Sequence, residues 1–98
     1  MKNFKETLGI DVSKCTLDTQ LHVTAVQTKV TNDLAGFKKL LSWALKSSGV
    51  ERSELLVCFE HTGMYSIQLA TFLEEKEIAY CMMPAIEIKR SLGMTLTP

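Results

Sequence analysis

The chain has 98 residues, eleven basic and eleven acidic side chains, and a hydrophobic share of 46%. A chain of this length builds one hydrophobic core, which excludes two independent domains. The balanced charge excludes the long-range attraction by which strongly basic domains bind nucleic acids unaided, and the composition excludes disordered and fibrous classes.

Residues 7–12, 15–23 and 24–30 predict three short strands. Apolar and polar side chains alternate in the first two segments, and the third segment is rich in Thr and Val. The connections between these segments are so short that neighbouring strands must be antiparallel. We therefore expect a three-stranded meander, with Asp11 near the end of its first strand.

A helix and a buried strand are expected next. Residues 31–33 supply a capping side chain and an acid for the first helical turn, and apolar residues recur at helical spacing up to a stop at Gly49. Residues 55–59 form an uninterrupted apolar run that ends in Glu60. Such a run is typical of a parallel strand in the middle of a sheet, because both of its faces are covered.

The last third of the sequence predicts two more helices and a strand. A helix is expected from residue 63 to about 76, a strand over residues 78–82, and a third helix from Pro84. The apolar residues that the first of these helices is expected to bury are Ile67, Leu69, Ala70 and Leu73. A crossover through a helix joins parallel strands, which places the fourth strand beside the first. The prediction is an α/β fold, ribonuclease-H-like, with a mixed five-stranded sheet in the order 3-2-1-4-5 and flanking helices.

Asp11 and Glu60 lie at the carboxyl ends of the two strands that this topology makes neighbours. Open α/β sheets bind ligands at this edge, where the strand order changes direction. Two close carboxylates repel unless a proton or a cation lies between them, and hard oxygen ligands favour Mg²⁺ or Mn²⁺ over zinc. We therefore expect a divalent metal site, with Asp18 as a third ligand if its face of the sheet is the active one. The alternative is that these acids are solvated residues at strand ends.

Two motifs carry a resemblance to a known family, G-I-D-V-S-K at residues 9–14 and E-H-T-G-M-Y at residues 60–65. Together with the segments at 32–37 and 93–97, they resemble the DEDD-type insertion-sequence transposases over nearly the whole chain. The resemblance implies a RuvC-resolvase-like domain whose first two catalytic, metal-binding acids are Asp11 and Glu60. It also implies a recombinase that uses a guide RNA to pair donor and target DNA.

The same resemblance implies that the chain is one part of a larger protein. The family's last two acids follow a Lys-rich segment beyond the point at which this sequence ends, and its nucleophilic serine belongs to a second domain. We therefore expect residues 1–98 to be a C-terminally truncated N-terminal domain that binds Mg²⁺ or Mn²⁺ weakly. It is expected to act on DNA within the full-length transposase and to cleave no DNA by itself.

Several side chains near the motifs are candidates for contact with nucleic acid. Lys14 follows the first acid, and Lys89 and Arg90 form a basic pair downstream, which suits contact with phosphates. Tyr65 suits stacking on a base, although one aromatic residue in a first helical turn more often packs against the core.

Ser13, Thr62 and Gly63 are expected to support the site. The Ser13 hydroxyl is a candidate to tune a metal-bound water, and a plain hairpin turn explains this serine equally well. Thr62 is a candidate helix cap. Gly63 permits a tight turn between strand and helix.

Three separated cysteines, Cys15, Cys58 and Cys81, form no C-x-x-C pair. Such thiols fit a reducing compartment better than a disulfide framework or a zinc site. No apolar run approaches the roughly 20 residues that span a bilayer, and the first residues lack signal-peptide character. We therefore expect a cytoplasmic protein without membrane contact.

Two other functions stay open at this point. The first is an ATP-binding half of the actin and sugar-kinase type, which begins with a similar G-x-D strand, although residues 12–14 replace its glycine-bearing turn. The second is a non-catalytic interaction module. Because truncation uncovers apolar surface, pairing with a second copy is expected under each function, and we predict a homo-oligomer.

Overall fold

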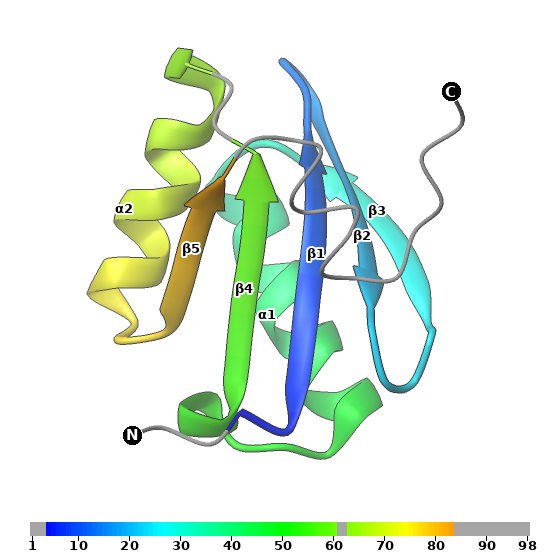
Figure 1. Ribbon diagram of the computed structural model, residues 1–98. Helices are drawn as coiled ribbons and strands as arrows, with labels where there is room; N and C mark the ends of the chain where they lie inside the picture. Colours follow the sequence, from blue (N-terminus) through cyan, green and yellow to red (C-terminus); the bar gives the residue numbers. More distant parts are fainter. Residues whose placement is uncertain (1–3, 61–62, 84–98) are drawn as a thin grey trace.

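The computed structural model describes residues 4–60 and 63–83, which form a mixed sheet with helices packed on one of its faces (Figure 1). The elements in chain order are β1 (Glu6–Val12), β2 (Thr16–Leu21), β3 (Gln27–Thr31), α1 (Leu34–Ser48), the 3-10 helix η1 (Arg52–Glu54), β4 (Leu55–Glu60), the 3-10 helix η2 (Gly63–Ser66), α2 (Ile67–Glu75) and β5 (Ala79–Met83). The third helix predicted from Pro84 lies outside the described residues.

The strand order is β3-β2-β1-β4-β5, which confirms the order predicted from the sequence. β1 pairs antiparallel with β2 and β2 with β3, whereas β4 lies parallel to both β1 and β5. This pattern follows from the connections, because short turns join the first three strands and helical crossovers join the parallel ones. The carboxyl ends of β1 and β4 consequently lie side by side at the upper edge of the sheet in Figure 1.

The turn between β2 and β3 is longer than predicted. Residues 22–26 separate the two strands, whereas the sequence predicted strands that meet at Val23 and Thr24. The buried carboxylate of Glu6 accepts hydrogen bonds from the backbone amides of Val23 (2.7 Å) and Thr24 (3.1 Å). Because these two amides donate to Glu6, they form no hydrogen bonds between β2 and β3. The chain then turns at Ala25, whose φ is 62°.

α1 begins and ends close to the predicted residues. Asp33 is the N-cap, and its side chain accepts a hydrogen bond from the Gly36 amide at 2.8 Å, so the acid expected in the first turn is the cap itself. At the other end, Gly49 takes the left-handed conformation with φ 72° and donates its amide to the helix. Gly36 lets the helix approach β3 closely, because a Cβ there would lie 1.8 Å from the Thr31 backbone oxygen.

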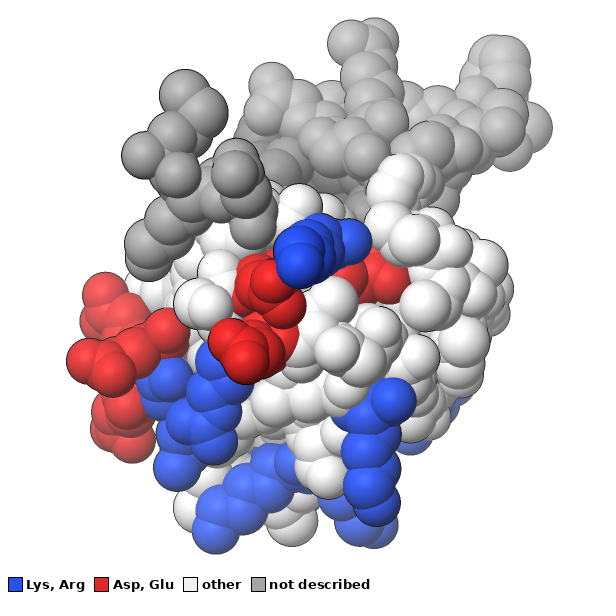
Figure 2. Space-filling view, turned by 90° about the horizontal axis from the view of Figure 1, so that it is seen from below, with Lys and Arg blue, Asp and Glu red and all other residues white. Residues whose placement is uncertain are grey.

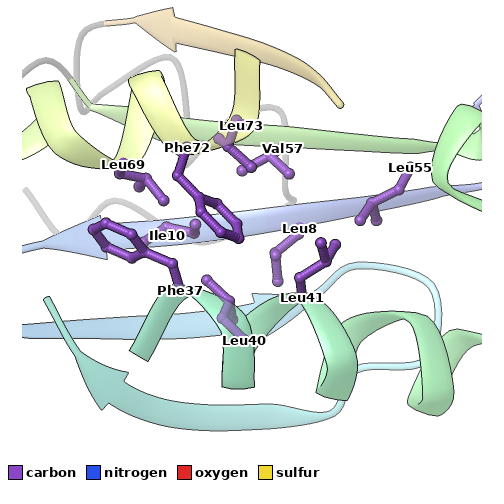
Figure 3. A pocket seen from close by; sticks show the side chains of 10 residues that line it. All are labelled: Leu8, Ile10, Phe37, Leu40, Leu41, Leu55, Val57, Leu69, Phe72 and Leu73. Carbon is purple, nitrogen blue, oxygen red and sulfur yellow. The ribbon is translucent and has the colours of Figure 1, made fainter. Parts of the chain in front are cut away.

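Apolar side chains from α1, α2, β1 and β4 fill the space between helices and sheet (Figure 3). At the centre, the Phe37 ring of α1 meets the Phe72 ring of α2, with centroids 5.5 Å apart. The gap that remains is about 10 Å³, which is at the lower limit for a single water molecule. This region is therefore packed interior and not a ligand pocket.

α2 buries a set of side chains that differs from the predicted one. Leu69 and Leu73 are buried as expected and Phe72 joins them, but Ile67 is 59% exposed, so its predicted burial is wrong. The physical reason is the repeat of the α-helix itself. Ile67 lies two residues before Leu69, which is about 200° around the helix axis, so Ile67 faces away from the sheet when Leu69 and Leu73 face it.

Candidate metal and nucleic-acid site

Asp11 and Glu60 lie level with each other on neighbouring parallel strands. Ile10 of β1 pairs with Phe59 of β4, and both of these side chains are buried on the helix-covered side. The next residue on each strand therefore points to the opposite face, and the strands lie about 4.8 Å apart. Asp11 is exposed and Glu60 is half-buried. This is the placement that the sequence predicted for the two acids, whose role as metal ligands stays a prediction.

A third acid lies on the same face of the sheet. Asp18 of β2 pairs directly with Asp11 across the antiparallel ladder, so the face singled out for Asp11 is also that of Asp18. The Asp18 carboxylate forms an ion pair of 3.5 Å with Lys29 of β3. Like charges directly opposite each other destabilise a strand pair, and Lys29 offsets part of that repulsion. Asp18 thus has a structural partner of its own.

The carboxylates suit a hard cation that is held by few protein ligands. Within residues 4–60 and 63–83, no group of three or more His, Cys, Asp or Glu side chains is arranged to hold a metal ion. Proteins often bind Mg²⁺ through one or two carboxylates, with water and substrate phosphates completing its coordination. The pair of Asp11 and Glu60 fits this kind of site.

The turn after β1 explains the local roles of Ser13 and Lys14. The Ser13 hydroxyl donates to the Thr16 backbone oxygen at 2.8 Å and lies 2.9 Å from the Thr16 hydroxyl. The Ser13 hydroxyl therefore closes the hairpin turn, which is the simpler of the two roles considered for this serine. Lys14 is exposed in this turn, three residues after Asp11, where its ammonium is accessible to a phosphate.

Gly63, the first residue of η2, has a backbone conformation that other residues rarely adopt. Gly63 has φ 61°, which agrees with its predicted backbone role in the turn from strand to helix. Tyr65, in η2, is 41% exposed, so its ring is accessible to a ligand. The described residues do not include Thr62, Lys89 or Arg90, and their predicted roles are untested.

The family model of the IS110-type DEDD transposases matches residues 8–97, a span that includes both Asp11 and Glu60. The chain belongs to this family of transposases. The match confirms the predicted family and, with the observed sheet, the ribonuclease-H-like fold of this transposase domain. A search of curated proteins finds no match. In the described part of this transposase chain, no helix is both long and apolar enough to cross a membrane.

The transposase chain also carries a basic groove that the sequence analysis missed. Lys38 and Lys46 of α1, Arg52 of η1 and Lys76 after α2 line a groove of about 430 Å³ that no acidic side chain lines. In Figure 2, basic side chains gather along the lower side of the molecule, which is the side of α1. The ion pairs within residues 4–60 and 63–83 are those of Lys5 with Glu54 and Lys29 with Asp18, so the groove cations lack carboxylate partners there.

This basic groove lies at the end of the sheet where the parallel strands begin. Arg52 lies in η1, which immediately precedes β4, and Lys76 lies between α2 and β5. Asp11 and Glu60 lie at the other end and on the other face. No short sequence motif predicts the groove, because its basic side chains come from three separate elements that lie together only in the folded chain.

Proposed function

We propose that this transposase domain holds Mg²⁺ or Mn²⁺ between Asp11 and Glu60 and acts on a DNA phosphate during transposition. The observation that carries the proposal is the level placement of the two carboxylates on neighbouring parallel strands. Carboxylates so close together repel each other, and binding of a cation relieves that repulsion. A bound divalent ion polarises a phosphoryl oxygen and stabilises the charge of the transition state.

The proposal is tested by the thermal stability of the 98-residue chain as Mn²⁺ or Mg²⁺ is added. An ion present at ten times its Kd stabilises a one-site protein by about 1.4 kcal/mol. We expect the Tm of the wild type to rise and the Tm of Asp11→Asn and Glu60→Gln to stay constant. Glu75→Gln is the control, because it removes an exposed acid of α2, on the other side of the sheet, and leaves the pair intact. An equal rise in all four proteins would contradict the proposal.

Contact with DNA is proposed at both ends of the sheet. Near the acids, the exposed Lys14 and Tyr65 support binding of a phosphate and a base, and Lys89 and Arg90 belong to the same proposal on the grounds of sequence alone. At the opposite end, the basic groove supports binding of a second stretch of phosphodiester backbone.

The groove is tested with the double variant Lys38→Gln, Lys46→Gln and a duplex DNA probe. Each phosphate contact contributes about 0.9 to the slope of log K against log salt, so losing two lowers the slope by about 1.8. Lys39→Gln is the control, since Lys39 is exposed on α1 but does not line the groove. An unchanged slope in the double variant, or an effect confined to an RNA probe, would refute the assignment to DNA.

The remaining expectations concern partners, location and the activity of this chain by itself. Guide RNA as a partner, action in the cytoplasm and the lack of DNA cleavage by this chain alone all rest on the family resemblance and composition. Self-association has structural support, because Leu34 and Ile67 are 57% and 59% exposed and line one shallow groove between α1 and α2. Light scattering at increasing protein concentration tests it, and a constant monomer mass would contradict a homo-oligomer.

A further inference from the structure

The Asn32 side chain joins the two segments that follow the acid-bearing strands. Its Nδ2 atom donates one hydrogen bond to the Ser13 backbone oxygen at 2.8 Å and another to the Tyr65 backbone oxygen at 2.9 Å. Ser13 follows Asp11 by two residues in the turn after β1, and Tyr65 follows Glu60 by five residues in η2. One side chain thus links the two strand ends on which the proposed metal site depends.

The segments that Asn32 links are closed by hydrogen bonds of their own. In the turn after β1, the Ser13 amide donates to the Thr16 backbone oxygen at 3.0 Å, and the Asn32 amide donates to the Cys15 backbone oxygen at 2.9 Å. In residues 63–66, a serine hydroxyl donates back to the first backbone oxygen of the turn at 3.1 Å. Because both partners are ordered turns, a fixed Asn32 side chain fixes their separation.

The orientation of the Asn32 amide is determined by its partners. Both partners are carbonyl oxygens, which only accept hydrogen bonds, so the NH₂ group must face them. This orientation leaves Asn32 Oδ1 buried without a hydrogen-bond partner in the described part of the chain. A buried acceptor without a donor is unfavourable, and the side chain keeps its position in spite of that cost.

The neighbouring residues explain how Asn32 reaches this position. Asp33 caps α1, and Gly36 lets the first turn of α1 lie against Thr31. Residues 32–37 contributed to the family resemblance. Because this segment places the start of α1, Asn32 lies between the turn after β1 and η2.

We infer that Asn32 is a positioning residue for the metal site, acting through the turn after β1 and through η2 to set the separation of the Asp11 and Glu60 carboxylates. The inference rests on the proposed function of those two acids. A matched pair of substitutions separates positioning from stability. Asn32→Asp keeps the size of the side chain but turns an acceptor toward two acceptors. Glu6→Gln is the control, because it weakens the turn between β2 and β3 at the opposite end of β1 and leaves both Asn32 hydrogen bonds in place.

The experiment measures Mn²⁺ affinity by electron paramagnetic resonance in the wild type, Asn32→Ala, Asn32→Asp and Glu6→Gln. Loss of a group that orients metal ligands typically weakens metal binding by about tenfold or more, and we expect a rise of about tenfold in the Kd of both Asn32 variants. Glu6→Gln should lower the Tm and leave the Kd unchanged. Asn32→Asp keeps the test valid if Asn32→Ala fails to fold.

Hydrogen exchange without metal supplies a second measurement. We expect faster exchange in residues 13–16 and 63–66 of both Asn32 variants and no such change in Glu6→Gln. Wild-type affinity in both Asn32 variants would overturn the inference and leave the proposed function standing. A wild-type chain that binds no Mn²⁺ would overturn the proposed function, and the inference with it.

Discussion

Glu6 is a buried carboxylate that holds the β2–β3 turn against β1, and its replacement is expected to loosen that turn. The residue is 2% exposed. Its Oε1 accepts from the amides of Thr7 at 2.9 Å and Val23 at 2.7 Å, and its Oε2 accepts from the amide of Thr24 at 3.1 Å and the Thr24 hydroxyl at 3.3 Å. Glu6 is thus a structural anion whose partners are mainly backbone amides.

The size of the effect follows from these hydrogen bonds. A hydrogen bond to a charged group contributes about 1.5–3 kcal/mol net. Glu6→Gln keeps the acceptor for Thr7 and Val23 but turns an NH₂ group toward the Thr24 amide, so we expect a loss of about 2 kcal/mol. Glu6→Ala loses every bond, but the exposed Val23 and Thr24 amides regain water, and we expect a loss of about 3 kcal/mol.

The pH dependence gives the effect a characteristic sign. Burial raises the pKa of Glu6, but the hydrogen bonds from Val23, Thr24 and Thr7 outweigh it, and the pKa of the folded state lies below the ordinary value of 4.5. The stabilisation by Glu6 is therefore complete above pH 4.5 and declines as the pH falls through the folded pKa. Because glutamine does not titrate, the stability difference between wild type and Glu6→Gln must shrink at low pH.

Urea unfolding followed by Trp43 fluorescence measures this difference at pH 7 and at about pH 3. Glu75→Gln is a useful control, since it removes an exposed carboxylate of α2 that takes no part in the β2–β3 turn. A difference between wild type and Glu6→Gln that is the same at both pH values, or smaller than about 0.5 kcal/mol at pH 7, would refute the reasoning.

Three further substitutions or reactions test the packing. Gly36→Ala should lower the free energy of unfolding in urea by about 2 kcal/mol or more. The clash of a Cβ 1.8 Å from the Thr31 backbone oxygen outweighs the roughly 1 kcal/mol that alanine gains inside a helix. A stabilised variant would show that α1 shifts freely. Leu69→Ala leaves a cavity at a fully buried position and should lower the free energy of unfolding by about 2–5 kcal/mol. A loss below about 1 kcal/mol would mean that the core collapses to fill that cavity. Burial raises the pKa of Cys58 to about 11, so iodoacetamide at about pH 8 should modify the exposed Cys15 first. Equal labelling rates in mass spectrometry would contradict the burial of Cys58.

The sequence alone determined the strand order and the adjacency of Asp11 and Glu60. Alternation of side chains marks each strand, and connection lengths leave little choice in their arrangement, since short turns require antiparallel pairs and helical crossovers require parallel ones. Two acids at the carboxyl ends of strands that must be neighbours then lie together. These conclusions depend on local pattern and chain connectivity, which a single sequence contains.

Only the tertiary structure decided the length of the β2–β3 turn, the basic groove and the link through Asn32. Glu6 reaches Val23 across 17 residues, and Asn32 reaches Tyr65 across 33. Nothing in the local pattern selects such partners, because a single hydrogen bond depends on where two distant segments meet once the core has packed.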